Sequence, residues 1–197
     1  MYLRPVFTVT DQARIVGLIE AYSFGQLITA GAGGMEASHV PFIVSLADGQ
    51  IVLEGHLGAA NPQCAALAGG QALATFCGPH AYIAPGWYKT QPAVPTWDYA
   101  AVHIHGTLEL VEDEASVSAM LRTLAKDDPE QFDLDALEDK YRLMMYKGIK
   151  GFRMKARKVE AQWKMSQNRS AEDRLSVIAA LRAQGNDACA DLIRSEE

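Results

Sequence analysis

The stretch GQLITAGAGGMEASHVPFIVSLADGQIVLEGHL, residues 25–57, gives this chain its β character. Three runs within it are rich in β-branched residues and bounded by glycines: GQLITA, ASHVPFIVSL and QIVLEGHL. Such runs predict β-strands, and the Asp48-Gly49 pair between the last two is typical of a hairpin turn. The stretch therefore predicts a β-meander.

The sequence on either side of this meander predicts helices and three further strands. Thr10 followed by Asp11 is typical of a helix start, and Asn61-Pro62 with Gly69-Gly70 encloses a short helix. The expected helices cover residues 11–22, 116–125, 134–146 and 170–184, with a turn at 127–129 and a last helical turn or two after Gly185-Asn186. The expected strands cover residues 73–77, 99–111 and 152–165.

Alternation of side chains defines the faces of the two long strands. Residues from Val102 to Leu110 place apolar side chains on one face, with His103 and His105 on the other. In the last strand the alternation slips by one residue near Arg157-Lys158, which indicates a β-bulge or a break between strands.

About six strands with short crossings and peripheral helices predict a mainly β protein of the α+β class, built as a small antiparallel barrel. No βαβ alternation occurs and no GxGxxG follows a strand, which excludes a doubly wound dinucleotide-binding sheet. Internal repeats and linkers are absent as well. We therefore expect a single domain over residues 1–197, with a helical C-terminal extension over about 170–194.

Composition indicates an ordinary soluble globular protein, with 49% hydrophobic and 21% charged residues. No apolar run is long enough for a bilayer and the first residues lack a signal-peptide core, so we expect a cytoplasmic protein without membrane contact. Its three cysteines form no CxxC pattern, and no disulfide framework or zinc cluster is indicated.

The charge balance argues against a protein that coats nucleic acid, because the net charge is −6. Residues 147–169 reverse that balance locally with eight basic residues against one acid, Glu160. This basic run could serve a phosphate, a nucleic acid or only solubility.

Half of the Trp and Tyr residues lie in a proline-rich segment, residues 78–106. These five aromatic residues are Tyr82, Trp87, Tyr88, Trp97 and Tyr99. Aromatic rings on a proline-stiffened loop form a surface suited to a flat ligand, although packing in a core or a dimer interface is an alternative.

Catalytic and metal motifs are weak. His103 and His105 share a strand face near Asp98, but two histidines do not make a catalytic zinc site, and we assign no metal. GxSxG and GxxxxGK[ST] are missing, and no catalytic residue is assigned, although His80 and His105 are the least implausible acid or base.

The residue types fit a cofactor with a phosphate tail and a flat ring better than they fit these catalytic motifs. Ser38, His56 and Arg169 are candidates for the phosphate, helped by the helix start at Asn61. Candidates for the ring are Trp87, Tyr88, Trp97 and Tyr99.

Five ordered blocks carry a resemblance: ASHVP (37–41), EGHLGAANPQ (54–63), FCGPHAYIAPGWY (76–88), VPTWDYAAVHIHG (94–106) and WKMSQNR (163–169). Through them the chain resembles the PaiB family of FMN-binding negative transcriptional regulators. The resemblance implies an antiparallel split β-barrel of the pyridoxamine-phosphate-oxidase type, assembled as a homodimer with FMN at the subunit interface.

The resemblance also implies a set of cofactor-binding residues. The phosphate would be met by Ser38, His39, His56 and Asn61. The partner chain would touch the flavin through Trp97, Tyr99 and the block that holds Trp163, Gln167 and Arg169.

Three departures from the family pattern bear on FMN affinity. Ala59 stands where relatives commonly carry a basic residue, which removes one phosphate cation. Asp98 stands where they tend to carry Asn, and a carboxylate facing an anion would repel it. Conversely, Arg153 and Lys155 add positive charge to a strand expected to be less basic.

Two functions follow as expectations. The first is an FMN-binding homodimer that regulates transcription without a recognisable DNA-reading motif, since no second helix follows residues 11–22 at helix-turn-helix spacing. The alternative is a flavin-dependent oxidoreductase that uses FMN at the dimer interface. A third possibility is that the fold binds haem or no cofactor.

Overall fold

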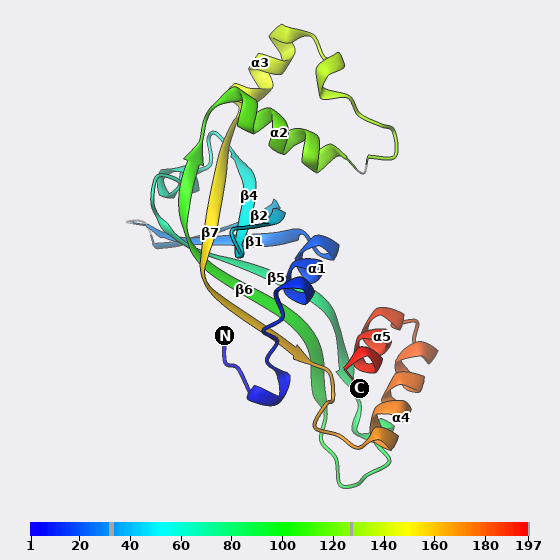
Figure 1. Ribbon diagram of the computed structural model, residues 1–197. Coiled ribbons are helices and arrows are strands. Elements are labelled where there is room, and N and C mark those ends of the chain that lie inside the picture. The colour runs from blue at the N-terminus through cyan, green and yellow to red at the C-terminus, as the bar shows by residue number, and fades with distance from the viewer. Residues whose placement is uncertain (32–33, 127, 197) are drawn as a thin grey trace. The chain divides into compact units, whose positions relative to one another are not determined.

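Seven strands form the sheet of the chain in its computed structural model (Figure 1). The structure describes residues 1–31, 34–126 and 128–196. The strands are β1 Phe24–Gly31, β2 Gly34–Pro41, β3 Ile43–Ala47, β4 Gln50–Gly58, β5 Gln71–Ile83, β6 Thr96–Val111 and β7 Ile149–Lys164. They pair in the order β2-β1-β5-β6-β7-β4-β3, and β1 pairs antiparallel with β2 and β5, as β4 does with β3 and β7. The mainly β, antiparallel prediction is confirmed.

The seventh strand arises because the expected strand over 37–46 is two strands. Pro41 has no N–H to give to a ladder, and Phe42 donates its N–H to the carbonyl of Ser23 at 2.9 Å. The chain changes partner there, since β2 pairs with β1 whereas β3 pairs with β4. The turn between β3 and β4 is the predicted one, with positive φ at both Asp48 (52°) and Gly49 (76°).

Within the described ranges, five α-helices and four short 3₁₀ helices accompany the strands. They are α1 Gln12–Ala21, α2 Glu114–Ala125, α3 Asp139–Lys147, α4 Ala171–Ala183 and α5 Asp187–Ser195, with η1 Pro5–Phe7, η2 Pro62–Ala66, η3 Pro85–Trp87 and η4 Leu134–Ala136. Asp11 caps α1 instead of Thr10, because its carboxylate accepts the N–H of Ala13 at 2.8 Å. No helix in the described ranges is long and apolar enough to cross a membrane.

The expected single helix over 134–146 is wrong. It is divided into η4 and α3 by extended backbone at Leu137 and Glu138. The apolar pattern misled because Leu134 is buried whereas α3 buries no residue, so the two pieces share no helical face. In the turn expected at 127–129, residue 127 lies outside the described residues.

Burial along β6 and β7 follows the predicted alternation. In β6 the even residues are buried as far as Leu108. In β7 the buried apolar residues change parity between Ala156 and Ala161, across the exposed pair Arg157-Lys158, and the polar Glu160 and Gln162 are buried as well. The slip is therefore real, and it lies inside one continuous strand instead of between two.

The Cα positions divide the chain into two compact units. Unit 1 comprises Met1–Ile15, Cys77–Val102 and Glu160–Glu197, and unit 2 comprises Val16–Phe76 and His103–Val159. Strands β5, β6 and β7 contribute residues to both units. The single-domain interpretation of residues 1–197 stays a prediction.

Each unit has its own buried apolar residues. In unit 2 the Phe42 ring meets Phe76 and Phe152 edge-on, with ring centroids 5.1 and 5.9 Å away. In unit 1, Val177, Leu181 and Ile193 bury the facing sides of α4 and α5, which lie side by side near the C-terminus (Figure 1).

Candidate functional site

The aromatic segment is mostly strand, not the loop that its prolines predicted. Strand β5 continues through Pro79 to Ile83, η3 follows, and β6 begins at Thr96. Pro79 does not end β5, and extended backbone suits the fixed φ of proline. Alternation along β5 then exposes His80 and Tyr82 and buries Ala81 and Ile83.

Three of the predicted flavin contacts are held within unit 1 by partners of their own. Tyr88 is 3% exposed, and the Arg169 guanidinium lies 4.1 Å from the centre of its ring. The Tyr99 hydroxyl accepts a short hydrogen bond from the Gln162 amide. Trp163 is buried and has the Arg14 guanidinium 5.8 Å from its ring centre.

The turn after β7 is fixed by Asp98 and Gln167. Asp98 is 1% exposed and accepts hydrogen bonds from Ser166 Oγ at 2.6 Å and Lys164 Nζ at 3.1 Å. Gln167 accepts the N–H of Met165 at 2.7 Å and donates to the carbonyl of Trp163 at 2.6 Å. Asp98 therefore serves unit 1 as an anchor, and its charge is partnered.

Desolvation by burial raises the pKa of Asp98. Its hydrogen bond from Ser166 and the nearby cations Lys164 and Arg169 oppose that rise. Burial, with help from the Asp98 charge, raises the pKa of Cys189 to about 12. Cys189 is thus a buried thiol with no nucleophilic character.

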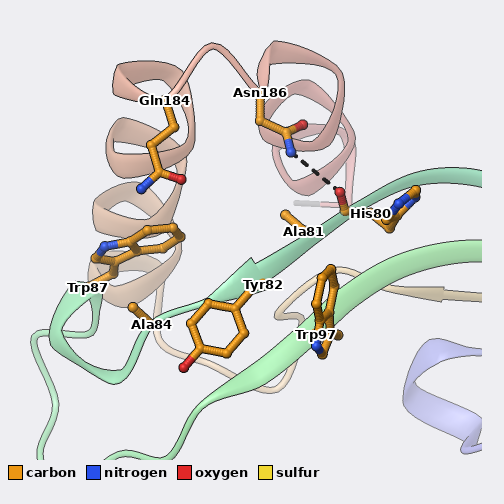
Figure 2. A pocket seen from close by; sticks show the side chains of 8 residues that line it. All are labelled: His80, Ala81, Tyr82, Ala84, Trp87, Trp97, Gln184 and Asn186. Atoms are coloured by element: carbon orange, nitrogen blue, oxygen red, sulfur yellow. Dashed lines mark hydrogen bonds between the residues drawn. The ribbon is translucent and has the colours of Figure 1, made fainter.

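Two predicted ring contacts, Trp87 and Trp97, line a hollow of about 480 Å³ in unit 1. Its other lining residues are His80, Ala81, Tyr82, Ala84, Gln184 and Asn186. Trp97 is 55% exposed and meets Tyr82 edge-on, with ring centroids 6.0 Å apart. Figure 2 shows the two indoles and the Tyr82 ring facing this space, with the turn between α4 and α5 above them. We call it the aromatic hollow.

In unit 2 the structure brings Ser38 and Asn61 together. Asn61 caps η2 as predicted, since its Oδ1 accepts the N–H of Gln63 at 2.9 Å. Its Nδ2 donates to Ser38 Oγ at 2.9 Å. The Ser38 hydroxyl accepts that bond, which leaves its own O–H able to donate to an anion.

The structure does not bring His56 to this pair. A Cβ on Gly55 would lie 3.0 Å from Val40, which shares a side of β2 with Ser38. His56 is the next residue and therefore projects to the opposite side of β4. Its Nδ1 is enclosed without a hydrogen-bond partner, and desolvation lowers its pKa. His39 is exposed, stacked on Phe24 and 3.1 Å from the Gln26 amide.

Lys150, which was not among the predicted site residues, adds a cation close to η2, the helix that Asn61 caps. Lys150 of β7 lies opposite Leu57 of β4, and Leu57 is on the same face of β4 as Gly55. The Lys150 side chain therefore projects to that face as well. Burial raises the pKa of the Cys64 thiol in η2, and the nearby Lys150 ammonium opposes that rise. The signal for Lys150 in the sequence was its membership of the basic run.

Three of the six basic residues of this run that lie in unit 2 are paired with carboxylates. Arg153 donates to Glu54 through Nε at 2.9 Å and Nη2 at 2.6 Å, and Lys155 lies 3.3 Å from Glu109. Lys150 itself lies 2.5 Å from Glu112 in an exposed pair. These pairings explain why the strand carries more positive charge than expected. Among the described residues no group of three or more His, Cys, Asp or Glu is placed to hold a metal ion.

Comparison with known proteins places the chain in a family. Residues 1–158 match the family model described as "Putative FMN-binding domain". The chain is 35% identical over 190 residues to "Protease synthase and sporulation protein PAI 2" of Bacillus subtilis, covering 94% of this chain and 91% of that protein.

Two solved structures share the fold. The flavocytochrome Anf3 from Azotobacter vinelandii matches with a TM-score of 0.63 and 13% identity over 82% of this chain and 72% of that one. The FAD and heme binding protein from Mycobacterium smegmatis matches with a TM-score of 0.59 and 14% identity over 80% and 73%. The likenesses confirm the predicted split-barrel fold.

The family model covers both the Ser38–Asn61 pair and the two indoles of the aromatic hollow, and it confirms FMN as the cofactor of the group. The Bacillus relative extends the match almost to the end of the chain. The chain belongs to the PaiB family of FMN-binding domain proteins.

Proposed function

We propose that this chain forms a homodimer that binds FMN and regulates gene expression in the cytoplasm, without reading DNA bases itself. The observation that carries the proposal is the Ser38–Asn61 pair, with Lys150 toward the same face of β4. A hydroxyl donor beside a cation is the chemistry that a phosphate monoester requires. Ring contact falls to the two indoles of the partner protomer's aromatic hollow. The roles of His39 and His56 stay predictions.

The fit to FMN can be tested with a matched pair of lysines. Lys150 and Lys155 both lie on β7, and each pairs with a glutamate. Their side chains project to opposite faces of the strand, because one residue number is even and the other is odd. Lys150→Ala should weaken FMN binding about 10-fold, the effect of one half-exposed charge-assisted hydrogen bond. Lys155→Ala should leave it unchanged. Riboflavin, which lacks the phosphate, should bind the two variants equally.

Equal FMN affinities of Lys150→Ala and Lys155→Ala would overturn the phosphate assignment. A Ser38→Ala variant adds an independent reading, because it removes the hydroxyl donor without changing charge. Ser38→Ala should likewise weaken the binding of FMN and leave the binding of riboflavin unchanged. Salt should weaken FMN binding to the wild-type protein more than to Lys150→Ala, since salt screens the lost charge.

The homodimer proposal is supported by the exposed edge of unit 2. Strand β2 lies at one end of the strand order, and Met35 on it is 76% exposed. Phe24, at the start of neighbouring β1, is 69% exposed. Exposed apolar side chains at an edge strand favour pairing with a second chain. Light scattering should give twice the 21.4 kDa chain mass, and Met35→Lys should shift it toward the monomer.

Regulation without base readout is supported by two features of the described residues. Strand β1 begins three residues after α1 ends, so no second helix follows at that point. Lys150, Arg153 and Lys155 of β7 are paired with carboxylates. The Bacillus relative's name associates that protein with protease synthesis and sporulation. A mobility shift showing tight, sequence-selective DNA binding by the isolated dimer would refute this mode of action. Rapid bleaching of the flavin by NADH or NADPH, followed by turnover with an acceptor, would favour the oxidoreductase.

A further inference from the structure

The aromatic hollow is open to ligands, and its lining contains no Asp, Glu, Lys or Arg. Trp97 and Tyr82 are 55% and 48% exposed, although large aromatic residues normally lose most of their exposure in a core. The hollow's volume of about 480 Å³ lies within the range of small-molecule sites, roughly 300–1,000 Å³. Tyr82, Trp87 and Trp97 project from β5, η3 and β6, and their rings offer faces on which a planar ligand can stack.

One wall of the hollow comes from the turn between α4 and α5, which lies beyond the family-matched residues 1–158. Gly185, with φ of 73°, makes this turn possible. Asn186 is committed to structure, because its Nδ2 donates to the carbonyl of His80 at 3.3 Å and its Oδ1 accepts the N–H of Cys189 at 3.3 Å. These bonds tie the turn to β5 within unit 1.

Gln184 differs from Asn186 because its side chain is exposed and its amide points toward the Trp87 indole (Figure 2). A primary amide offers both N–H donors and a carbonyl acceptor. It can therefore pair with the polar edge of a heterocycle whose faces stack on the indoles.

We propose that the aromatic hollow binds a planar, uncharged aromatic ring system, and that Gln184 determines which ring is preferred by hydrogen bonding to its polar edge. The ring can be the isoalloxazine of FMN, in which case the inference rests on the proposed function, or a separate planar molecule. Stacking on Trp97 supplies the affinity and Gln184 supplies the selectivity.

The test uses the full-length protein and two phosphate-free probes, lumiflavin and 3-methyllumiflavin, which differ in one ring-edge N–H. Binding is followed by quenching of the ring's fluorescence. Trp97→Ala should weaken both probes about 5- to 100-fold, the range expected for loss of one stacking partner. The wild-type protein should prefer lumiflavin, and Gln184→Ala should remove that preference with a loss of about 2- to 10-fold for lumiflavin alone.

Glu172→Ala is the matched control, because Glu172 is exposed on α4 but does not line the hollow. It should bind both probes as the wild-type protein does. Circular dichroism checks that Trp97→Ala and Gln184→Ala are folded, which their exposed side chains favour. Unchanged lumiflavin affinity in a folded Trp97→Ala protein would overturn the inference, and so would an undiminished preference in Gln184→Ala.

FMN titrations separate the two sources of the ring. Weaker FMN binding in both Trp97→Ala and Lys150→Ala supports the isoalloxazine as the occupant. Weaker lumiflavin binding in Trp97→Ala with unchanged FMN binding supports a separate planar ligand in the hollow. Loss of the Lys150 effect on FMN contradicts the phosphate assignment alone, because lumiflavin has no phosphate.

Discussion

Asp98 offers the sharpest test of how unit 1 is held together, because two substitutions separate the effect of its charge from the effect of its shape. Asp98→Asn keeps the size and one acceptor oxygen, whereas Asp98→Ala removes both acceptors of a side chain that is 1% exposed. The alanine variant leaves Ser166 and Lys164 without the carboxylate that they contact at 2.6 and 3.1 Å.

The expected magnitudes follow from these contacts. Breaking a buried charged pair by removing one partner costs about 3–5 kcal/mol. Lys164 retains the Thr96 hydroxyl at 2.7 Å and side-chain exposure of 22%, so the lower end, about 3 kcal/mol, applies to Asp98→Ala. Burial raises the pKa of Asp98, which means that the site disfavours the charge itself. Asp98→Asn should therefore cost only about 1 kcal/mol or less.

Urea unfolding followed by circular dichroism at about pH 7 measures both variants. The sign of the pH effect is fixed by the raised pKa. The folded protein retains the Asp98 proton above the unfolded value of 3.8, so ionisation lowers stability as pH rises through the folded pKa. The advantage of the wild-type protein over Asp98→Asn should shrink over that window. Equal destabilisation by Asn and Ala, or a stable Ala variant, would refute the reasoning.

Three further predictions concern titration and ion pairing. The pKa of His56 is lowered, so unfolding at mildly acidic pH takes up a proton, and the melting temperature should fall as pH drops through about 6.5. The melting temperature of His56→Gln should fall less over the same pH range. The pKa of Asp173 is lowered chiefly by its hydrogen bond from the Thr90 N–H, so Asp173→Asn should be less stable than the wild-type protein at about pH 7, and the gap should close as pH falls through the lowered pKa in thermal melts. Glu54→Gln, which breaks the half-exposed pair with Arg153, should cost about 0.5–1 kcal/mol in low-salt urea unfolding and less in about 1 M salt.

The strands could be predicted from local patterns because their faces differ in burial. Alternation in β6 and the parity slip in β7 both appear in the structure, and Asp48-Gly49 makes its turn through positive φ. The predicted strand boundaries were wrong where they depend on which strand each segment pairs with. Phe42 divides a continuous β-branched run because its N–H bonds to Ser23 instead of a neighbouring strand.

The candidate site was predicted in part, by residue type and resemblance. Ser38 and Asn61 were both among the predicted phosphate contacts, and they are hydrogen bonded. It could not separate His56 from them, because the side of β4 that faces β2 depends on how distant strands pair. Gln184 carried no sequence signal, since its position above Trp87 results from the packing of α4 and α5.

Asp98 shows why a substitution is difficult to interpret from sequence alone. A carboxylate in place of Asn suggested repulsion of an anionic ligand. Its side chain is instead enclosed with Ser166 and Lys164 in unit 1. The role of Asp98 depends on the direction of its side chain, which is set by strand parity and by the turn after β7.

Titration of the purified protein with FMN, followed by visible absorption and calorimetry, tests whether the chain binds FMN with Lys150 at the phosphate. We expect saturable binding at micromolar FMN, one flavin per protomer, with weaker binding by Lys150→Ala and unchanged binding by Lys155→Ala. Absence of flavin binding in this range by the folded wild-type protein would contradict this expectation.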